Sequence, residues 1–402
     1  MACQQSNLFQ YRAAQTLSRV ASTLLFRCRT LRNEIKNVEG PYTIIANHQA
    51  ALDFVNLIGA TRRPIRFVIS QSFFSTLPIR GTLEKIGVIP KQQFQTAAGD
   101  LRKMRAALDA GQPLAIYPAG LMCEDGLSTP IPAATYKFLK WLGTDIYMAR
   151  TEGTYFVMPK WAGGIRPGRT TMDIYRLFTK EELADMTEEE IRARAEPALL
   201  YDAYREQEQH RAVYMGGRNL QGLEQVLYRC PHCGGEHTVA AKKNRLYCTA
   251  CGYEQVSDRY GFLHNRKGLG EEIRYVSDWS RRIYEQVKDS LRRGENTSLT
   301  EAVEIRMVDT AKKKFVPVGT GTLSLNAAGF TLQGTIGGEA TEIAVSITNV
   351  PTLPFSPGKH LELQQGSTIY RCIPRDGRLV MKFIHMVKAF YELRHAPVTT
   401  EI

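Results

Sequence analysis

The 402-residue chain lacks any run of about 18 or more apolar residues, the length that a membrane-spanning helix needs. Its first residues also lack the apolar core and small-residue cleavage site of a secretory signal. Cysteine is scarce, and four of the eight cysteines lie close together at 230–251 while the others are scattered. This distribution argues against a disulfide framework, so we expect a cytoplasmic protein.

Acidic residues are too few to balance the basic ones, and the formal net charge is +12. This excess favours an anionic partner, either nucleic acid or a membrane surface. In the N-terminal segment Leu17, Val20 and Leu24 recur at helical spacing among several arginines. We therefore predict that residues 1–40 form a basic amphipathic helix in the membrane interface. A core-packing first helix with a solvated cationic face is the alternative.

Strand-like and helix-like segments alternate over residues 40–180, which predicts an α/β fold with a mixed, mainly parallel sheet. Residues 99–111 and 134–143 read as helices that end at glycine. After about residue 300, short strands are separated by Gly, Asn and Pro, and a final amphipathic helix follows. This last module resembles pleckstrin-homology-like domains in architecture. The predicted organisation is the N-terminal helix at 1–40, an α/β domain at 41–216, a cysteine-containing unit at 217–275, a linking helix at 276–296 and a β-rich domain at 297–402.

The stretch YTIIANHQAALD places His48 just after an apolar strand, with Asp53 five positions later. Open α/β sheets bind ligands beyond the carboxyl ends of their strands, where His48 is expected to lie. In a regular helix, residues five apart face different directions, so the pair can meet only across a turn. There the carboxylate would hold one imidazole nitrogen while the other faces a substrate hydroxyl.

Four sequence blocks resemble the glycerolipid (lysophospholipid) acyltransferases, which include bacterial acylglycerol-phosphate acyltransferases. The blocks are NHQAALD at 47–53, IGVIPK at 86–91, PLAIYPAG at 113–120 and FVMPKW at 156–161. Their order and separations match the family's Asn-His-x-x-x-x-Asp block, its strand ending in a basic residue, its Pro-Glu-Gly block and its apolar run ending in proline. The resemblance implies an acyltransferase domain, with His48 and Asp53 as the catalytic residues.

The third block departs from the family, because Ala119, Met122 and Cys123 replace its glutamate, arginine and serine. In the family the first two help to bind the acceptor, and a thioether cannot replace a guanidinium on phosphate. Lys91, Arg150 and Lys160 are candidate replacement cations, although each has the alternative of being a solvated charge. The residues that we assign to substrate binding are Asn47, Lys91, Tyr117, Pro118, Gly120, Arg150 and Lys160.

The resemblance implies direct transfer of a fatty acyl group from acyl-carrier protein or acyl-CoA to a hydroxyl of a lysophospholipid or related lipid. His48 would be the general base and Asp53 would fix its tautomer, without a serine or cysteine nucleophile. Backbone donors near Gly120 are candidates for the oxyanion site. The protein is then expected at the inner face of the membrane, as a peripheral enzyme of phospholipid biosynthesis. A catalytically silent acyltransferase-like protein that binds lipid or a partner is the first alternative.

Two Cys-x-x-Cys pairs, Cys230/Cys233 and Cys248/Cys251, have the spacing of a zinc ribbon. Four thiolates leave no open coordination position, so the predicted Zn²⁺ is structural and would stabilise a unit too small for its own core. A zinc ribbon with nearby cations at 241–245 raises a second alternative, a nucleic-acid-binding protein. No aromatic stacking platform or recognition helix accompanies it, which disfavours this alternative.

Overall fold

The computed structural model describes residues 7–76, 80–92, 98–309, 311–348 and 352–395, and it divides into two compact units. The first unit comprises the residues up to Arg218 together with Arg259–Gly261, and the second comprises the remainder. The ribbon, the linking helix and the β-rich module therefore fall into one unit. Their finer division stays a prediction.

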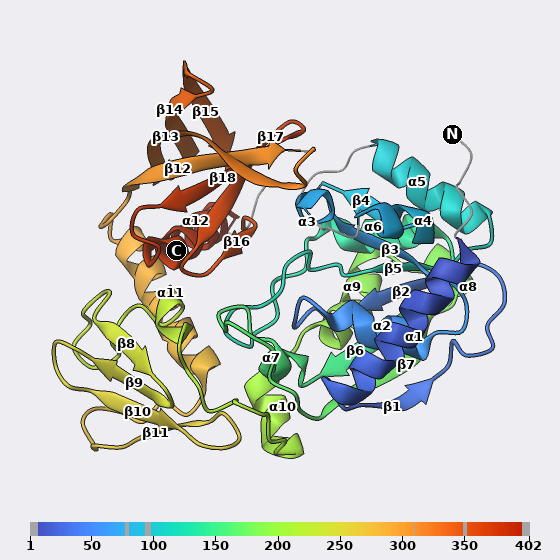
Figure 1. Cartoon of the computed structure of the whole chain (residues 1–402), viewed down its shortest axis with the longest axis horizontal. Helices are drawn as coiled ribbons and strands as arrows, with labels where there is room; N and C mark the ends of the chain where they lie inside the picture. Colours follow the sequence, from blue (N-terminus) through green and yellow to red (C-terminus); the bar gives the residue numbers. More distant parts are fainter. Residues whose placement is uncertain (1–6, 77–79, 93–97, 310, 349–351, 396–402) are drawn as a thin grey trace, which may run out of the picture. The chain divides into compact units, whose positions relative to one another are not determined.

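The first unit is built on a seven-stranded sheet with the order β1-β7-β6-β2-β5-β3-β4 (Figure 1). All neighbours are parallel except β6 and β7, so the prediction of a mixed, mainly parallel sheet is confirmed. The strands are β1 (Cys28–Asn33), β2 (Thr43–Ala46), β3 (Arg66–Ser70), β4 (Ile89–Lys91), β5 (Leu114–Ile116), β6 (Ile146–Glu152) and β7 (Thr170–Phe178).

Ten helices accompany this sheet in the described part of the first unit. They are α1 (Leu8–Leu24), α2 (Asp53–Ala60), α3 (Gln71–Thr76), α4 (Arg80–Ile86), α5 (Ala98–Asp109), α6 (Ala134–Leu142), α7 (Thr154–Val157), α8 (Lys180–Asp185), α9 (Glu188–Leu199) and α10 (Ala203–His210). Helix α6 ends as predicted, with Gly143 in the left-handed conformation.

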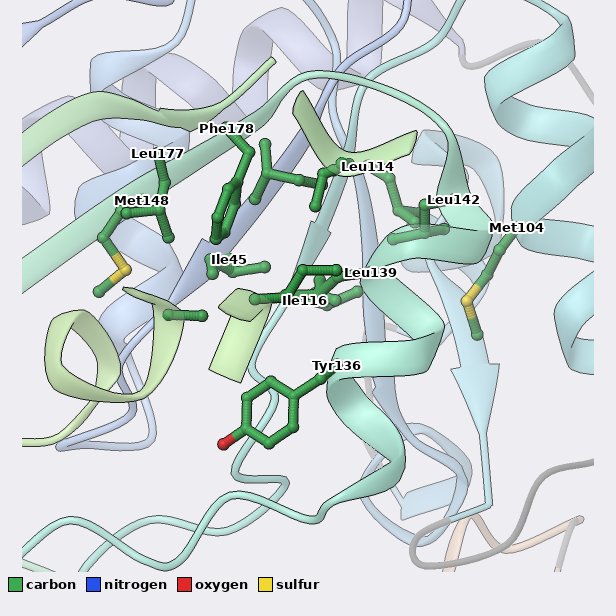
Figure 2. Close-up of a cluster of buried hydrophobic side chains, with 14 of the residues drawn as sticks. Ile45, Met104, Leu114, Ile116, Tyr136, Leu139, Leu142, Met148, Leu177 and Phe178 are labelled. Atoms are coloured by element: carbon green, nitrogen blue, oxygen red, sulfur yellow. The ribbon is translucent and has the colours of Figure 1, made fainter. Parts of the chain in front are cut away.

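Alternation along the strands supplies both faces of the sheet with apolar side chains. Ile44 and Ala46 pack with Leu57 and Ile58 of α2, whereas Ile45 belongs to the opposite core. Figure 2 shows that opposite core, in which strand residues meet side chains of α5 and α6. Its labelled members are Ile45, Met104, Leu114, Ile116, Tyr136, Leu139, Leu142, Met148, Leu177 and Phe178. The sheet thus has an apolar core on each face. A ligand site is then expected at the carboxyl ends of its strands.

The N-terminal prediction was partly wrong, because the helix ends at Leu24 and residues 28–33 form strand β1. Strand β1 runs parallel to β7 as the edge of the sheet, and most of its side chains are exposed. Its residues are extended because they pair with β7, about 140 residues later in the chain. The spacing of apolar residues within the segment does not predict this pairing.

The second unit contains two antiparallel sheets, with the strand orders β11-β10-β9-β8 and β15-β14-β13-β12-β18-β17-β16. This confirms the predicted β-rich C-terminal part, while the likeness to pleckstrin-homology domains stays a prediction. The elements are η1 (Leu223–Gln225), β8 (Val239–Lys242), β9 (Arg245–Cys248), β10 (Glu254–Ser257), β11 (Leu263–Asn265), α11 (Val276–Arg292), β12 (Leu299–Asp309), β13 (Lys314–Asn326), β14 (Gly329–Ile336), β15 (Glu339–Ser346), β16 (Phe355–Ser356), β17 (His360–Gln365), β18 (Thr368–Pro374) and α12 (Leu379–His395).

Candidate active site and metal centre

His48 and Asp53 meet across the turn between β2 and α2. Strand β2 ends at Ala46 and α2 begins at Asp53, so residues 47–52 form a connection that we call the His48 loop. His48 Nδ1 lies 3.1 Å from Asp53 Oδ2. Because an ionised carboxylate can only accept, Nδ1 donates this bond and Nε2 is the nitrogen left to act as a base.

Asp53 is itself fixed by the backbone of the loop. Its Oδ2 accepts the N–H groups of Gln49, at 2.7 Å, and Ala50, at 2.9 Å, in addition to the imidazole. The residue is 2% exposed, and its Oδ1 has no hydrogen-bond partner among the described residues. One buried oxygen therefore sets both the shape of the loop and the orientation of the imidazole.

Asn47 and Tyr117, both predicted to bind substrate, lie next to His48, the first in sequence and the second by a ring contact. The Asn47 amide exchanges two hydrogen bonds with the backbone of Thr151, at 2.7 and 2.8 Å, so it joins the loop to β6. The Tyr117 ring lies 4.5 Å from the His48 ring, centroid to centroid. Burial raises the pKa of Tyr117, which keeps its hydroxyl protonated beside the imidazole.

The altered third block forms a tight turn after β5. Gly120 has φ +69°, a conformation that favours glycine, and its N–H donates to the Tyr117 carbonyl at 2.9 Å. That N–H is therefore already engaged, and Pro118 beside it is half-buried. Cys123 is fully buried, burial raises the pKa of its thiol, and Sγ lies 3.7 Å from the Gln49 carbonyl oxygen. Such a thiol suits packing better than nucleophilic attack.

The three predicted cations have different surroundings. Lys160 Nζ lies 3.4 Å from the carbonyl oxygen of Met122, the position at which the family has arginine. Lys91, at the end of β4, donates to the Gln92 carbonyl at 2.9 Å, and burial lowers the pKa of its ammonium group. Of the three predicted cations, Lys160 is therefore the one with a contact to the altered block.

Arg150 binds carboxylates and backbone carbonyls of its own domain, in a polar cluster that the sequence did not predict. Its guanidinium contacts Glu206 at 2.6 Å and Glu152 at 3.3 Å, and it donates to the carbonyls of Ala198 and Leu200. Glu206 also accepts from the side chain of Gln49 at 3.2 Å. Burial is the largest influence on Glu206 and raises its pKa to about 7, although Arg150 opposes the shift.

The four clustered cysteines converge in the second unit. Their sulfurs all lie within 4.8 Å of one another, with Cys230 to Cys251 at 3.8 Å and Cys233 to Cys248 at 3.7 Å. Sulfurs placed tetrahedrally at about 2.3 Å from a zinc ion are about 3.8 Å apart. Each Cys-x-x-Cys turn ends in a left-handed glycine whose N–H donates to the carbonyl of the first cysteine. Two matching turns thus present four thiols suited to one metal ion.

The raised pKa of Glu206 predicts a dependence of stability on pH. Between the unfolded value of about 4.3 and the folded value, the folded state binds more protons, so stability falls as pH rises. In E206Q this contribution is absent. We expect the free energy of unfolding of E206Q, relative to the wild type, to increase by about 2 kcal/mol from pH 5 to pH 8.

Urea unfolding at both pH values measures this difference. The control is E189Q, because Glu189 is exposed in the first turn of α9. An equal offset between E206Q and the wild type at pH 5 and pH 8 would contradict the assignment of a raised pKa to Glu206.

Two comparisons with known proteins give a match. Residues 27–158 match the family model described as Acyltransferase. Among solved structures the chain is similar to the 1-acyl-sn-glycerophosphate (LPA) acyltransferase PlsC from Thermotoga maritima, with a TM-score of 0.42 and 18% identity over 47% of this chain and 76% of that one. No curated protein sequence matches. The His48–Asp53 pair therefore lies within the segment that matches the Acyltransferase family model.

Proposed function

We propose that the protein is an O-acyltransferase that moves a fatty acyl group from acyl-carrier protein or acyl-CoA to a hydroxyl of a lysophospholipid or related lipid. The observation that carries this proposal is the hydrogen bond of 3.1 Å between His48 and Asp53 inside an acyltransferase-family segment. It leaves Nε2 of a partly exposed imidazole available as a general base.

In the proposed reaction, His48 Nε2 takes the proton of the acceptor hydroxyl as the oxygen attacks the thioester carbonyl carbon. The carbon–sulfur bond then breaks, and the imidazolium returns the proton to the departing thiolate. The Asp53 carboxylate stabilises the imidazolium and holds its tautomer, as in other base-activated acyl transfers. The products are an ester and a free thiol, and no covalent enzyme intermediate is formed.

Replacing His48 by alanine is expected to reduce kcat by a factor of about 10² to 10⁴, because the base is lost. The melting temperature should change little, since His48 is partly exposed. Turnover is measured with acyl-carrier-protein and CoA donors against a panel of lysophospholipid and glycolipid acceptors.

The matched control is H264A. His264 also lies 3.1 Å from an aspartate, Asp258, but belongs to strand β11 of the second unit. This variant should retain wild-type turnover. Full activity of H48A would eliminate the proposed mechanism.

We propose that Lys160 binds the anionic group of the acceptor. Its contact with the Met122 carbonyl puts a cation beside the altered block, whereas the Arg150 guanidinium is engaged by two carboxylates and two carbonyls. An ammonium group binds phosphate as a point charge and does not require the bidentate geometry of arginine.

The variant K160M is expected to raise KM for a phosphate-bearing acceptor by roughly tenfold, the equivalent of about 1.4 kcal/mol. Its KM for an uncharged glycolipid acceptor should not change. The control is K137M, on the exposed surface of α6. Equal changes for both acceptor classes would remove Lys160 from headgroup binding.

Helix α1 is proposed to hold the protein on an anionic membrane, at the inner face. No helix in the described ranges is long and apolar enough to cross a bilayer. Instead, α1 buries the polar face that contains Gln15 and Ser18 against its own domain and exposes Phe9, Leu17 and Leu24 by 82%, 71% and 64%. Figure 1 shows α1 lying along α2. An outward apolar stripe with neighbouring arginines suits an interfacial helix.

The substitution L17E should weaken sedimentation with phosphatidylglycerol-containing vesicles several-fold, because it places a charge in the stripe. The control A184E adds the same charge on α8, a helix whose Leu183 packs in the opposite core of the domain. Binding of L17E equal to that of A184E would argue against α1 as the membrane-binding element.

The cysteine centre is proposed to hold one structural Zn²⁺, with Cys230, Cys233, Cys248 and Cys251 as ligands. When bound, the ion would cross-link two turns that have little apolar core of their own. The four thiols suit this role because their sulfurs lie within 4.8 Å of one another and would supply all four ligands of a tetrahedral site.

In C248S, the zinc content is expected to fall well below one ion per chain, and the melting temperature should drop. The metal is measured by atomic emission and the stability by thermal unfolding. The control C28S changes a cysteine outside the centre and should keep its zinc. A C248S protein with unchanged zinc would contradict the assignment.

A catalytically silent, lipid-binding protein is the second candidate, favoured by Ala119 and Met122 at the acceptor positions. Such a protein would bind lysophospholipid but acylate none of the acceptors in the panel.

A further inference from the structure

The His48 loop is held by a segment that lies beyond the family match. The match ends at residue 158, whereas Tyr201 and the residues of α10 follow it by more than 40 positions. Tyr201 Oη donates to the carbonyl oxygen of His48 itself, at 2.8 Å. Tyr201 is only 7% exposed, and a ring fixed in this way has few alternative positions.

The next residue of the loop has a second attachment to the same segment. The Gln49 side chain is fully buried and donates to Glu206 of α10 at 3.2 Å. Its carbonyl oxygen accepts from Thr154 and from the N–H of Tyr155, both at 3.2 Å. Gln49 thereby ties the loop to α7 as well as to α10.

The segment is in turn anchored to the body of the domain. Tyr201 and Ser128 exchange two hydrogen bonds, at 3.0 and 3.2 Å, next to the third block. Arg150 on β6 binds Glu206 and the carbonyls of Ala198 and Leu200. The segment that contacts the His48 loop is therefore itself hydrogen-bonded to the body of the domain.

We propose that Tyr201 and Glu206 are positioning residues for the His48–Asp53 pair. They act on the backbone of His48 and on the side chain of Gln49, and they keep the imidazole where Nδ1 donates to Asp53. This inference rests on the proposed acyl transfer, and it adds residues to that site which the family match does not cover. A shift of the loop by a fraction of an ångström would misalign the base with the acceptor hydroxyl.

Two variants remove these contacts, and the first of them changes the side-chain volume little. Y201F deletes only the hydroxyl and should lower kcat by roughly tenfold with KM unchanged, because substrate contacts are kept. E206A should have a similar effect, whereas E206Q retains an acceptor for Gln49 and Arg150 and should restore most of the activity. Y175F, which removes a tyrosine hydroxyl on β7, is the control and should behave as the wild type.

A second measurement does not depend on turnover. Histidine ¹⁵N NMR, assigned with H48Q, reports the tautomer of the His48 ring. The wild type should show the Nδ1–H tautomer, and Y201F and E206A should show a mixture of tautomers. Full activity of Y201F and E206A in an enzyme that H48A inactivates would overturn the positioning role and leave the proposed function intact. If the wild type acylates nothing, the proposed function fails, and an unchanged tautomer in Y201F would then overturn the positioning role as well.

Discussion

Most of the site depends on one carboxylate oxygen of Asp53. Oδ2 accepts two backbone N–H groups of the His48 loop and the imidazole N–H, at 2.7, 2.9 and 3.1 Å. The two backbone bonds fix a carboxylate that begins α2, where the helix N-terminus also favours negative charge. Because the same oxygen binds the loop backbone and the imidazole, the formation of this turn also aligns His48 with Asp53.

The proposed acceptor side of the site lacks two residues of the family block that it resembles. Ala119 is buried and Met122 brings no charge, so the block supplies neither the carboxylate nor the phosphate-binding guanidinium of the family that it resembles. Lys160, from the block after β6, approaches the Met122 carbonyl from another part of the chain. In the proposed function, the base and the cation that binds the acceptor therefore come from different segments of the chain.

The sequence predicted those features that depend on neighbouring residues. The strand ending before His48, the glycine that ends α6 and the two cysteine turns all follow from local patterns. Strand β1 and the cluster around Glu206 could not be predicted in this way. The first requires pairing with β7, and the second joins Gln49 to a carboxylate 157 residues away. The sequence suggests Arg150 as a substrate cation because its shortest carboxylate contact, Glu206, lies 56 residues further along the chain.

The proposed reaction is a direct transfer, in which the acyl chain passes from the thioester to the acceptor hydroxyl with His48 as the general base. Intact-protein mass spectrometry during a single turnover with a labelled acyl thioester tests this claim most directly. The account predicts unmodified protein at every time point while labelled ester accumulates. An acylated enzyme that forms and decays at the rate of product formation, with the acyl group on Cys123 or any other side chain, would contradict it.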